Sequence, residues 1–235
     1  MTKLDDIMMK KEFSLTKVEL DMFENYKNLL QEWNEKIDIT NIIEDEDVYV
    51  KHFLDSLMIF DSELVDDYMK VIDIGTGGGF PGIPMKIFNE TLEITLLDSL
   101  NKRITFLDDV IDKLELQDVE AVHGRAEELS RKKEYREVYD IATSRAVANL
   151  RTLTEYCLPF VKVGGYFIAM KGPDPHDEVK EAQNSINKLG GRLVKVMEFN
   201  LPVENSGRSL VIIQKTNRTD KKYPRGQGKP RTKPL

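Results

Sequence analysis

Hydrophobic positions in the N-terminal third of the chain repeat at the interval of a helix. Thr16 and Glu19 have the spacing of a capping box, which marks a helix start. The apolar residues that follow lie three or four positions apart and define one face: Phe23, Tyr26, Leu30 and Trp33. A second helical pattern covers residues 48–60. We therefore expect residues 1–68 to form a helical cap that packs on the rest of the chain.

From residue 70 the pattern changes to short apolar runs of strand length that alternate with helical patterns. The expected strands cover 70–75, 92–97, 119–123, 140–143 and 166–170. Helices are expected within 104–114, 150–161 and 178–189, the second closed by Gly164 and Gly165. Two last runs, 193–199 and 209–215, have no helix between them and should pair antiparallel. The predicted fold is α/β, a mostly parallel seven-stranded sheet ending in an antiparallel hairpin, over residues 69–216.

Composition limits the cellular setting and the type of site. Hydrophobic residues make up 40% of the 235 positions, and Cys157 is the only cysteine, so an internal disulfide is excluded. Apolar runs are shorter than the roughly 20 residues that span a bilayer, and the first residues resemble neither a signal nor a transit peptide. We expect a cytoplasmic protein with no membrane contact. The three histidines are widely separated, so we expect no metal. The oligomeric state stays open, with a monomer favoured.

Charge is unevenly distributed along the chain. Eight of the 34 basic residues but only one of the 41 acidic residues lie within 215–235, so this segment carries +7 and the remaining chain −14. Proline and glycine in residues 217–235 argue against a helix, and we expect an extended basic arm that contacts nucleic-acid phosphates. A solvated tail that only improves solubility is the equally weighted alternative.

The stretch from Asp73 to Gly82 directly follows the first expected strand and predicts a ligand crevice. Its glycines fit two registers: GxGxG from Gly75, or the dinucleotide pattern GxGxxG from Gly77. Pro81 would sit where a helix and a pyrophosphate should meet, and Asp73 is unfavourable beside a pyrophosphate. S-adenosylmethionine has no phosphate, and its cationic methionine end tolerates a carboxylate. The first register and this cofactor are therefore favoured, with Gly75, Gly77 and Phe80 as contacts.

Two further strand ends supply candidate cofactor contacts. Asp98 and Ser99 follow the second strand, where a carboxylate can accept hydrogen bonds from ribose hydroxyls; a helix N-cap is the alternative. Ala126 and Glu127 follow the third strand, where a backbone amide and a carboxylate could read the adenine edge. Glu127 alone would more often be a solvated acid at a helix start.

Basic residues near the later strands are candidate substrate contacts. Arg145 follows the fourth strand and could clamp a substrate or the methionine carboxylate, or could form a structural ion pair. Lys171 follows the fifth strand, and Arg225 lies in the basic arm; both are candidates for RNA phosphates. His52 could face the site or the surface. Cys157 is interpreted as a core residue rather than a nucleophile.

Together these segments resemble the bacterial 16S ribosomal RNA guanine-N7 methyltransferases, also called glucose-inhibited division protein B. The motifs that carry the resemblance are Trp33-Asn34, Asp38 to Asn41, His52 to Leu57, Asp73 to Pro84, Leu97 to Ser99 with Lys102-Arg103, Gly124 to Glu127, Thr143 to Ala146, Met170 to Gly172 and Tyr223 to Leu235. The resemblance implies a class I (Rossmann-like) methyltransferase fold. It also implies cofactor contact by Gly75, Phe80, Ala126, Glu127 and Arg145, and methylation of a guanine in the decoding region of small-subunit rRNA.

Methylation at guanine N7 uses a ring lone pair and releases no proton, so no general base is required. Rate should come from in-line positioning and exclusion of water. The alternatives are a methyltransferase acting on a small molecule or protein, a nicotinamide-dependent dehydrogenase, and a non-catalytic ribosome-assembly factor that keeps the cofactor as a structural ligand.

Ligand-induced thermal shifts separate the two readings of the glycine loop. S-adenosylmethionine at about 100 times its Kd should add about 2.7 kcal/mol to the free energy of unfolding, whereas NAD should add none. Differential scanning fluorimetry with each ligand in turn checks this. Stabilisation by NAD alone would reverse the assignment of the loop.

Overall fold

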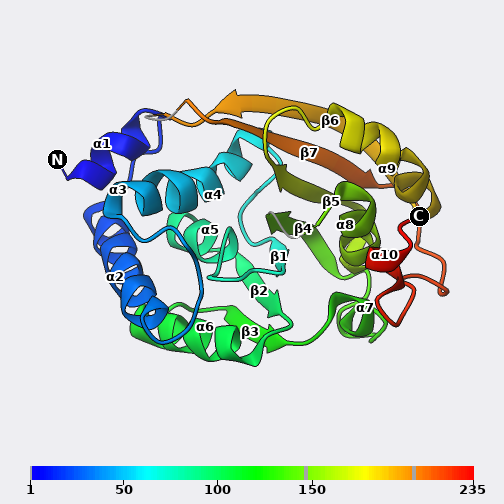
Figure 1. Ribbon diagram of the computed structural model, residues 1–235, viewed down its shortest axis with the longest axis horizontal. Coiled ribbons are helices and arrows are strands. Elements are labelled where there is room, and N and C mark those ends of the chain that lie inside the picture. Colours follow the sequence, from blue (N-terminus) through cyan, green and yellow to red (C-terminus); the bar gives the residue numbers. More distant parts are fainter. Residues whose placement is uncertain (1, 146–147, 203–204) are drawn as a thin grey trace.

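The computed structural model describes residues 2–145, 148–202 and 205–235. Its centre is a seven-stranded sheet with the strand order β3-β2-β1-β4-β5-β7-β6 (Figure 1). The strands are β1 (Lys70–Ile74), β2 (Glu93–Asp98), β3 (Val119–His123), β4 (Tyr139–Arg145), β5 (Val161–Lys171), β6 (Gly191–Asn200) and β7 (Gly207–Lys215). The first five strands pair parallel, and β7 pairs antiparallel with both β5 and β6. The predicted sheet and its terminal hairpin are confirmed.

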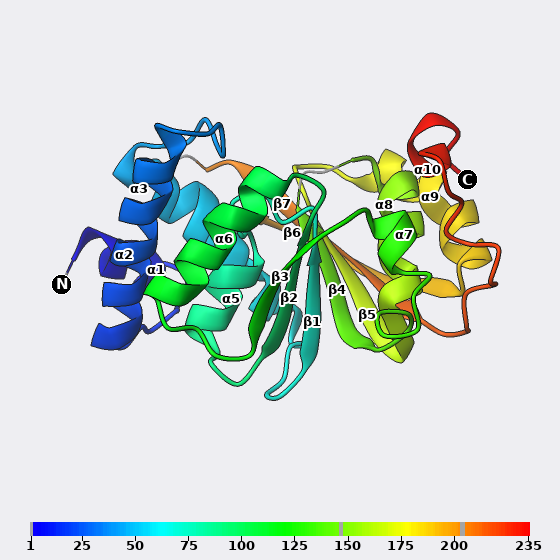
Figure 2. The same ribbon diagram turned by 90° about the horizontal axis from the view of Figure 1, so that it is seen from below.

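Helices cover both faces of the sheet, as the alternation of strands and helices requires. Figure 2 shows α5 (Gly82–Phe88) and α6 (Asn101–Lys113) on one side, and α7 (Ala126–Leu129), α8 (Leu150–Cys157) and α9 (His176–Lys188) on the other. The side chains of β1 alternate between the two cores: Val71 belongs to one hydrophobic cluster, and Ile72 and Ile74 to the other. Cys157 is fully buried in the second cluster, so its interpretation as a core residue is confirmed.

Helix α8 ends, and strand β5 begins, earlier in the sequence than predicted. Helix α8 ends at Cys157, a 3-10 turn covers Leu158–Phe160, and β5 begins at Val161, which pairs with Tyr139. Pro159 in that turn cannot continue the hydrogen bonding of an α-helix. The two glycines expected to close the helix therefore lie inside β5, and the prediction of a helix through residue 161 is wrong.

The N-terminal helices pack on the α5 and α6 side of the sheet (Figure 2). They are α1 (Lys3–Met9), α2 (Lys17–Asn34), α3 (Asp45–Asp47), the π-helical turn η1 (Val48–Leu54), α4 (Asp55–Leu57) and the 3-10 turn η2 (Met58–Ser62). The capping box of α2 is present as predicted. Phe23, Tyr26 and Phe53 share one hydrophobic cluster with Ile83 of α5 and Phe106 of α6. Burial of this apolar surface holds these helices to the core; the boundary of the cap at residue 68 stays a prediction.

The C-terminal segment differs from the extended arm that we expected. It folds back beside α7 and α8 and contains a one-turn helix, α10 (Lys229–Thr232) (Figure 1). Pro230 lies in the first turn of α10, where a missing N–H costs nothing. Side chains of the core donate hydrogen bonds to main-chain oxygens of the segment, such as Arg136 to Thr219 (2.8 Å). The expectation of a non-helical arm is wrong for residues 229–232, because these contacts outweigh the low helix propensity.

Candidate active site

The candidate site lies where the strand order reverses. Strand β1 has β2 on one side and β4 on the other, so the connections that leave these strands diverge and open a crevice at their carboxyl ends. The glycine loop follows β1, and β4 ends at Arg145. The sheet thus brings two segments of the predicted site to one edge.

A buried carboxylate gives the glycine loop its shape. Asp73 is fully buried at the end of β1, and its Oδ2 accepts hydrogen bonds from Thr76 Oγ1 (2.6 Å) and the N–H of Gly82 (2.9 Å). Gly77 and Gly79 have φ angles of +62° and +93°, a region that side chains disfavour. The loop therefore turns sharply at glycines and returns to the carboxylate as α5 begins.

Helix α2 supports the same loop from the other side. The hydroxyl of Tyr26 is fully buried and donates a hydrogen bond to the main-chain oxygen of Gly78. Burial raises the pKa of Tyr26 well above its usual value, so the phenol stays protonated and acts as a donor. The periodicity of the sequence predicts only that Tyr26 lies on an apolar helix face. It does not predict this role, because it does not indicate which group the hydroxyl contacts.

Two cavities meet at the glycine loop and share Gly75, Asp98 and Ser99. The first, of about 410 Å³, is also lined by Ile39, Thr40, His52, Thr76, Gly77, Gly78, Phe80, Arg103 and Arg145. The second, of about 280 Å³, is also lined by Ile74, Leu97, Gly124, Arg125, Ala126, Glu127, Ala148, Tyr156, Gly228, Arg231 and Thr232. The crevice thus collects all the predicted cofactor contacts, although their roles stay predictions.

Asp98 joins the second strand to the glycine loop. Its Oδ2 accepts the N–H of Gly77 (3.0 Å) and faces Arg103 (3.1 Å), and its Oδ1 accepts the N–H of Leu100 (2.9 Å). The N-cap of α6 is Leu100, without a side-chain cap, so neither Asp98 nor Ser99 occupies the N-cap position that we considered. A carboxylate oxygen has two lone pairs, so Oδ1 retains capacity for a hydroxyl donor.

Ala126 and Glu127 form the wall of the smaller cavity at the start of α7. Glu127 is only 6% exposed, which rejects the alternative of a solvated acid. Its Oε1 lies 4.0 Å from Arg125 NH1, at the limit of an ion pair. This carboxylate therefore keeps acceptor capacity toward the cavity.

Arg145 ties the N-terminal helices to the end of β4. Its guanidinium donates to the main-chain oxygen of Lys51 (3.0 Å), to Asp55 Oδ2 (3.0 Å) and to His52 Nδ1 (3.0 Å), and it lies 4.9 Å from the Phe80 ring centroid. The side chain is 13% exposed. Arg145 therefore forms the structural ion pair that we considered as an alternative, and it also lines the cavity beside the glycine loop.

His52 faces the site rather than the surface. Its ring stacks on Phe80 with 4.3 Å between centroids and an interplanar angle of 11°, and its Nε2 lies 2.9 Å from Thr40 Oγ1. Burial and the charge of Arg145 lower the pKa of His52 to about 3. The imidazole is thus neutral, with Nδ1 accepting from Arg145 and Nε2–H donating to Thr40.

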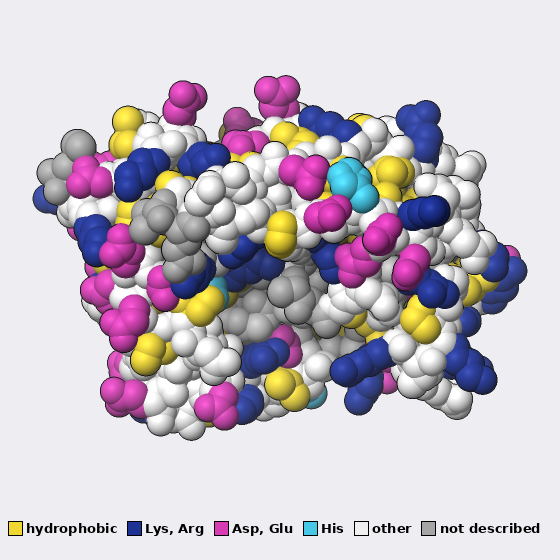
Figure 3. All heavy atoms as spheres, turned by 45° about the horizontal axis from the view of Figure 1, so that its top comes forward, with side chains coloured by type: hydrophobic (Ala, Val, Ile, Leu, Met, Phe, Trp, Pro, Cys, Tyr) yellow, Lys and Arg dark blue, Asp and Glu magenta, His cyan; other side chains and the backbone are white. Residues whose placement is uncertain are grey.

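A third cavity, of about 360 Å³, opens on the other side of Arg145; we call it the basic cavity because four of its lining residues are Lys or Arg. It shares His52 and Arg145 with the first cavity and is also lined by Ile42, Lys51, Asp55, Met170, Lys171, Gly172, Phe199, Arg208 and Ser209. The buried Asp55 bridges two cations, since its other oxygen lies 3.2 Å from Arg208 Nε. Lys171 pairs with Glu178 (2.9 Å). Figure 3 shows Lys and Arg side chains beside a hollow on this side of the molecule.

Of two residues predicted to contact the substrate, one lines the basic cavity and the other does not. Lys171 lines the basic cavity, whereas Arg225 lies beside α8 with its guanidinium paired to Glu155 (2.6 Å). A phosphate would have to compete with Glu155, so RNA contact by Arg225 stays a prediction without structural support. Ala146, part of the motif after β4, lies outside the described residues.

A larger cavity, of about 640 Å³, lies at the opposite edge of the sheet and includes residues at the amino ends of β1, β2 and β3: Lys70, Glu93 and Val119. Ligands of open α/β sheets bind outside the carboxyl ends of the strands, so we place the site at the smaller cavities. Asp174, His176 and Glu198 bring potential metal ligands within 4.8 Å of one another, but all three are exposed.

Comparison with known proteins decides the family. The family model of rRNA small subunit methyltransferase G matches residues 19–207. A protein of that name from Clostridium novyi (strain NT) is 52% identical over 215 residues, covering 92% of this chain and 88% of that protein. Its counterpart from Desulforamulus reducens is 52% identical over 224 residues, covering 95% and 93%. The chain belongs to the rRNA small subunit methyltransferase G family. The resemblance seen in the sequence is confirmed, and family membership excludes the dehydrogenase alternative.

Solved structures of other methyltransferases have the same fold as this chain. A SAM-dependent methyltransferase from Aquifex aeolicus superposes with a TM-score of 0.54 at 16% identity, covering 78% of this chain and 97% of that one. TYW2 of M. jannaschii, solved with AdoMet, gives a TM-score of 0.52 at 12% identity, covering 68% and 76%. The class I methyltransferase fold is therefore confirmed. The part of the chain that the structure describes has no helix long and apolar enough to cross a membrane.

One buried atom tests whether this methyltransferase site suits a cationic cofactor. Asp73 Oδ1 is buried and has no hydrogen-bond partner among the described residues. Burial raises the pKa of Asp73 to about 6, although the hydrogen bonds from Thr76 and Gly82 oppose the shift. An ionised, half-satisfied carboxylate favours a ligand with positive charge nearby and disfavours a pyrophosphate.

The pKa of Asp73 predicts a pH-dependent affinity for S-adenosylmethionine. Because folding raises this pKa, the contribution of Asp73 to the stability of the ligand-free protein is present below about pH 4 and lost as the pH rises through 6. A cationic ligand prefers the ionised form, so its Kd should increase about tenfold from pH 7.5 to pH 5. In Asp73→Asn, which keeps the acceptor for Gly82, calorimetric titration should find a weak Kd without this dependence. The same slope in both proteins would remove Asp73 as its cause.

Proposed function

We propose that this chain transfers a methyl group from S-adenosylmethionine to N7 of a guanine in 16S rRNA, in the decoding region of the small subunit. One observation carries the proposal: the first cavity at the glycine loop and the basic cavity share His52 and Arg145 as a common wall. A ligand in the first cavity and a ligand in the basic cavity would therefore lie next to each other at that wall. The names of the relatives supply the rRNA, and cytoplasmic location belongs to the same proposal.

The residues of the crevice suit the two ends of the cofactor. Asp98 would accept the ribose hydroxyls, and Ala126 with Glu127 would meet the adenine edge. Gly75, Gly77 and Phe80 would hold the methionine end, near the unpaired oxygen of Asp73. The bound cofactor supplies an electrophilic methyl group on a sulfonium.

The basic cavity suits a nucleotide. Lys51, Arg145, Lys171 and Arg208 surround it, and Met170 with Phe199 adds apolar surface for a base. Asp55 offsets part of this positive charge and fixes both arginines, because it contacts Arg145 and Arg208 with separate oxygens. Fixed guanidinium groups lose little conformational entropy when they bind phosphate.

Catalysis at N7 requires placement rather than proton transfer. The guanine lone pair attacks the methyl carbon, and the bond from that carbon to sulfur breaks. His52 stays neutral at physiological pH, and both of its ring nitrogens already have hydrogen-bond partners, so it serves to orient Arg145 and Phe80. Positioning and exclusion of water supply the rate.

The decisive assay is transfer of labelled methyl to unmethylated small-subunit particles and to protein-free 16S rRNA, followed by digestion to nucleosides. We expect 7-methylguanosine to carry the label. Label in another nucleoside would overturn the N7 assignment. No label on either RNA, with S-adenosylmethionine binding intact, would overturn the rRNA assignment and favour a methyltransferase acting on a small molecule or protein, or the non-catalytic assembly factor.

Arg208→Gln tests the basic cavity separately from the cofactor. Loss of one phosphate contact should weaken RNA binding about tenfold and lower the salt slope by about one, with an unchanged Kd for S-adenosylmethionine. Arg192→Gln is the matched control, since Arg192 lies on the same hairpin, pairs with Gln214 and is exposed. Filter binding across a salt series measures both. Equal effects of the two substitutions would show that only general charge matters.

A further inference from the structure

The C-terminal segment is fixed to the core by its main chain. Arg136, in the loop after α7, donates to the main-chain oxygens of Thr219 (2.8 Å) and Tyr223 (3.1 Å). Arg131 donates to the oxygens of Lys222 (3.2 Å) and Pro224. Core arginines thus hold the segment through its main-chain oxygens.

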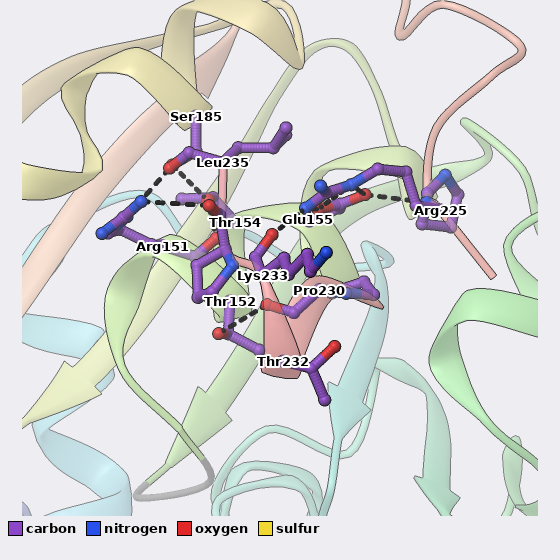
Figure 4. A network of polar contacts seen from close by, with 12 residues as sticks. Arg151, Thr152, Thr154, Glu155, Ser185, Arg225, Pro230, Thr232, Lys233 and Leu235 are labelled. Carbon is purple, nitrogen blue, oxygen red and sulfur yellow. Dashed lines mark hydrogen bonds and ion pairs between the residues drawn. The ribbon is translucent and has the colours of Figure 1, made fainter. Parts of the chain in front are cut away.

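Helix α8 holds the remainder of the segment (Figure 4). Thr152 Oγ1 donates to the oxygen of Pro230 (3.0 Å), and Arg151 donates to the oxygen of Leu235 (2.8 Å). Glu155 is fully buried and accepts hydrogen bonds from Arg225 Nε (2.9 Å) and NH2 (2.6 Å). A buried ion pair with two hydrogen bonds fixes the position of the segment, because separating it would leave a buried charge unpaired.

This docking brings residues 228–232 to the smaller cavity at the glycine loop. Gly228, Arg231 and Thr232 line it together with Ala126 and Glu127 from α7. Tyr156 of α8 also lines it, and the charges of both Glu127 and Arg231 act on the pKa of the Tyr156 phenol, which burial raises. Arg231 and Glu127, more than 100 positions apart in the sequence, therefore line the same cavity as Tyr156.

We propose that residues 228–232 form the outer wall of the adenosine end of the cofactor site, with Arg231 and Thr232 as ligand contacts. The inference rests on the proposed use of S-adenosylmethionine. A guanidinium can stack on a purine face or donate to its ring nitrogens, and a hydroxyl can pair with ribose or with the adenine edge. Neither group needs a phosphate, so the wall suits a nucleoside end.

Two residues of α10 separate this role from general attraction of RNA. Arg231 and Lys229 carry the same charge, and both are exposed, but only Arg231 lines the cavity. Phosphate attraction would make Arg231→Gln and Lys229→Gln equivalent in RNA binding and would leave cofactor binding unchanged. A cofactor wall makes them unequal in cofactor binding.

The experiment titrates the intact chain, Arg231→Gln and Lys229→Gln with S-adenosylmethionine and with 5′-methylthioadenosine, which lacks the amino-acid end. We expect Arg231→Gln to raise both Kd values by the same factor, about tenfold. Lys229→Gln should stay within twofold of the intact chain for both ligands, and thermal unfolding should be alike in all three proteins.

Unchanged Kd values in Arg231→Gln, with normal binding by the intact chain, would overturn this inference and leave the proposed function standing. Loss confined to S-adenosylmethionine would place Arg231 at the other end of the ligand and would also overturn it. Failure of the intact chain to bind S-adenosylmethionine would overturn the proposed cofactor and this inference together.

Discussion

The arrangement of the site depends on the contacts of one guanidinium. Arg145 ends β4, yet its hydrogen bonds go to Lys51, His52 and Asp55 of the N-terminal helices. Parallel strands bring the carboxyl ends of β1 and β4 together, but they do not determine where a separate helical layer lies. Three directed hydrogen bonds from a rigid, planar group supply that orientation, and the hydrophobic cluster shared by the two layers supplies most of the attraction.

Asp55 and Phe80 complete this junction. Asp55 accepts from Arg145 on one oxygen and faces Arg208 on the other, so it connects the N-terminal helices to the terminal hairpin. Phe80 stacks with His52 and lies under Arg145, so the glycine loop contacts the same group of side chains. Elements from four parts of the sequence therefore meet within one polar and aromatic cluster: the N-terminal helices, the glycine loop, β4 and the terminal hairpin.

The sequence predicts the sheet well because period and order are local properties. Apolar runs gave seven strands close to their observed positions, and the missing helix between the last two gave the antiparallel hairpin. The helix before β5 was predicted too long, because an apolar run such as residues 158–161 fits either a helix or a strand. The π-helical turn at residues 48–54 was not predicted, since its periodicity is close to that of an α-helix.

The candidate site was predicted only in part, because local patterns in the sequence indicate some of its residues and not others. The sequence predicts Asp73, Asp98, Glu127 and Arg145 as site residues, because each lies at or just after the carboxyl end of a predicted strand. Tyr26, Arg208 and Arg231 reach the site from α2, β7 and α10, and their positions follow from long-range packing that no local pattern records. The charge of the C-terminal segment predicts a basic arm. Its docking on the core was not predicted, because many of its hydrogen bonds to the core use main-chain oxygens, which every residue has.

His52 and Arg145 line the first cavity and the basic cavity at once, which gives them a thermodynamic consequence beyond their geometry. A ligand that moves or stiffens this shared wall changes the free energy of binding in the neighbouring cavity. This coupling is reciprocal: if one ligand changes the affinity for the second by some factor, the second changes the affinity for the first by the same factor. The free energy of the doubly occupied state is therefore the same whether the cofactor or the nucleotide binds first.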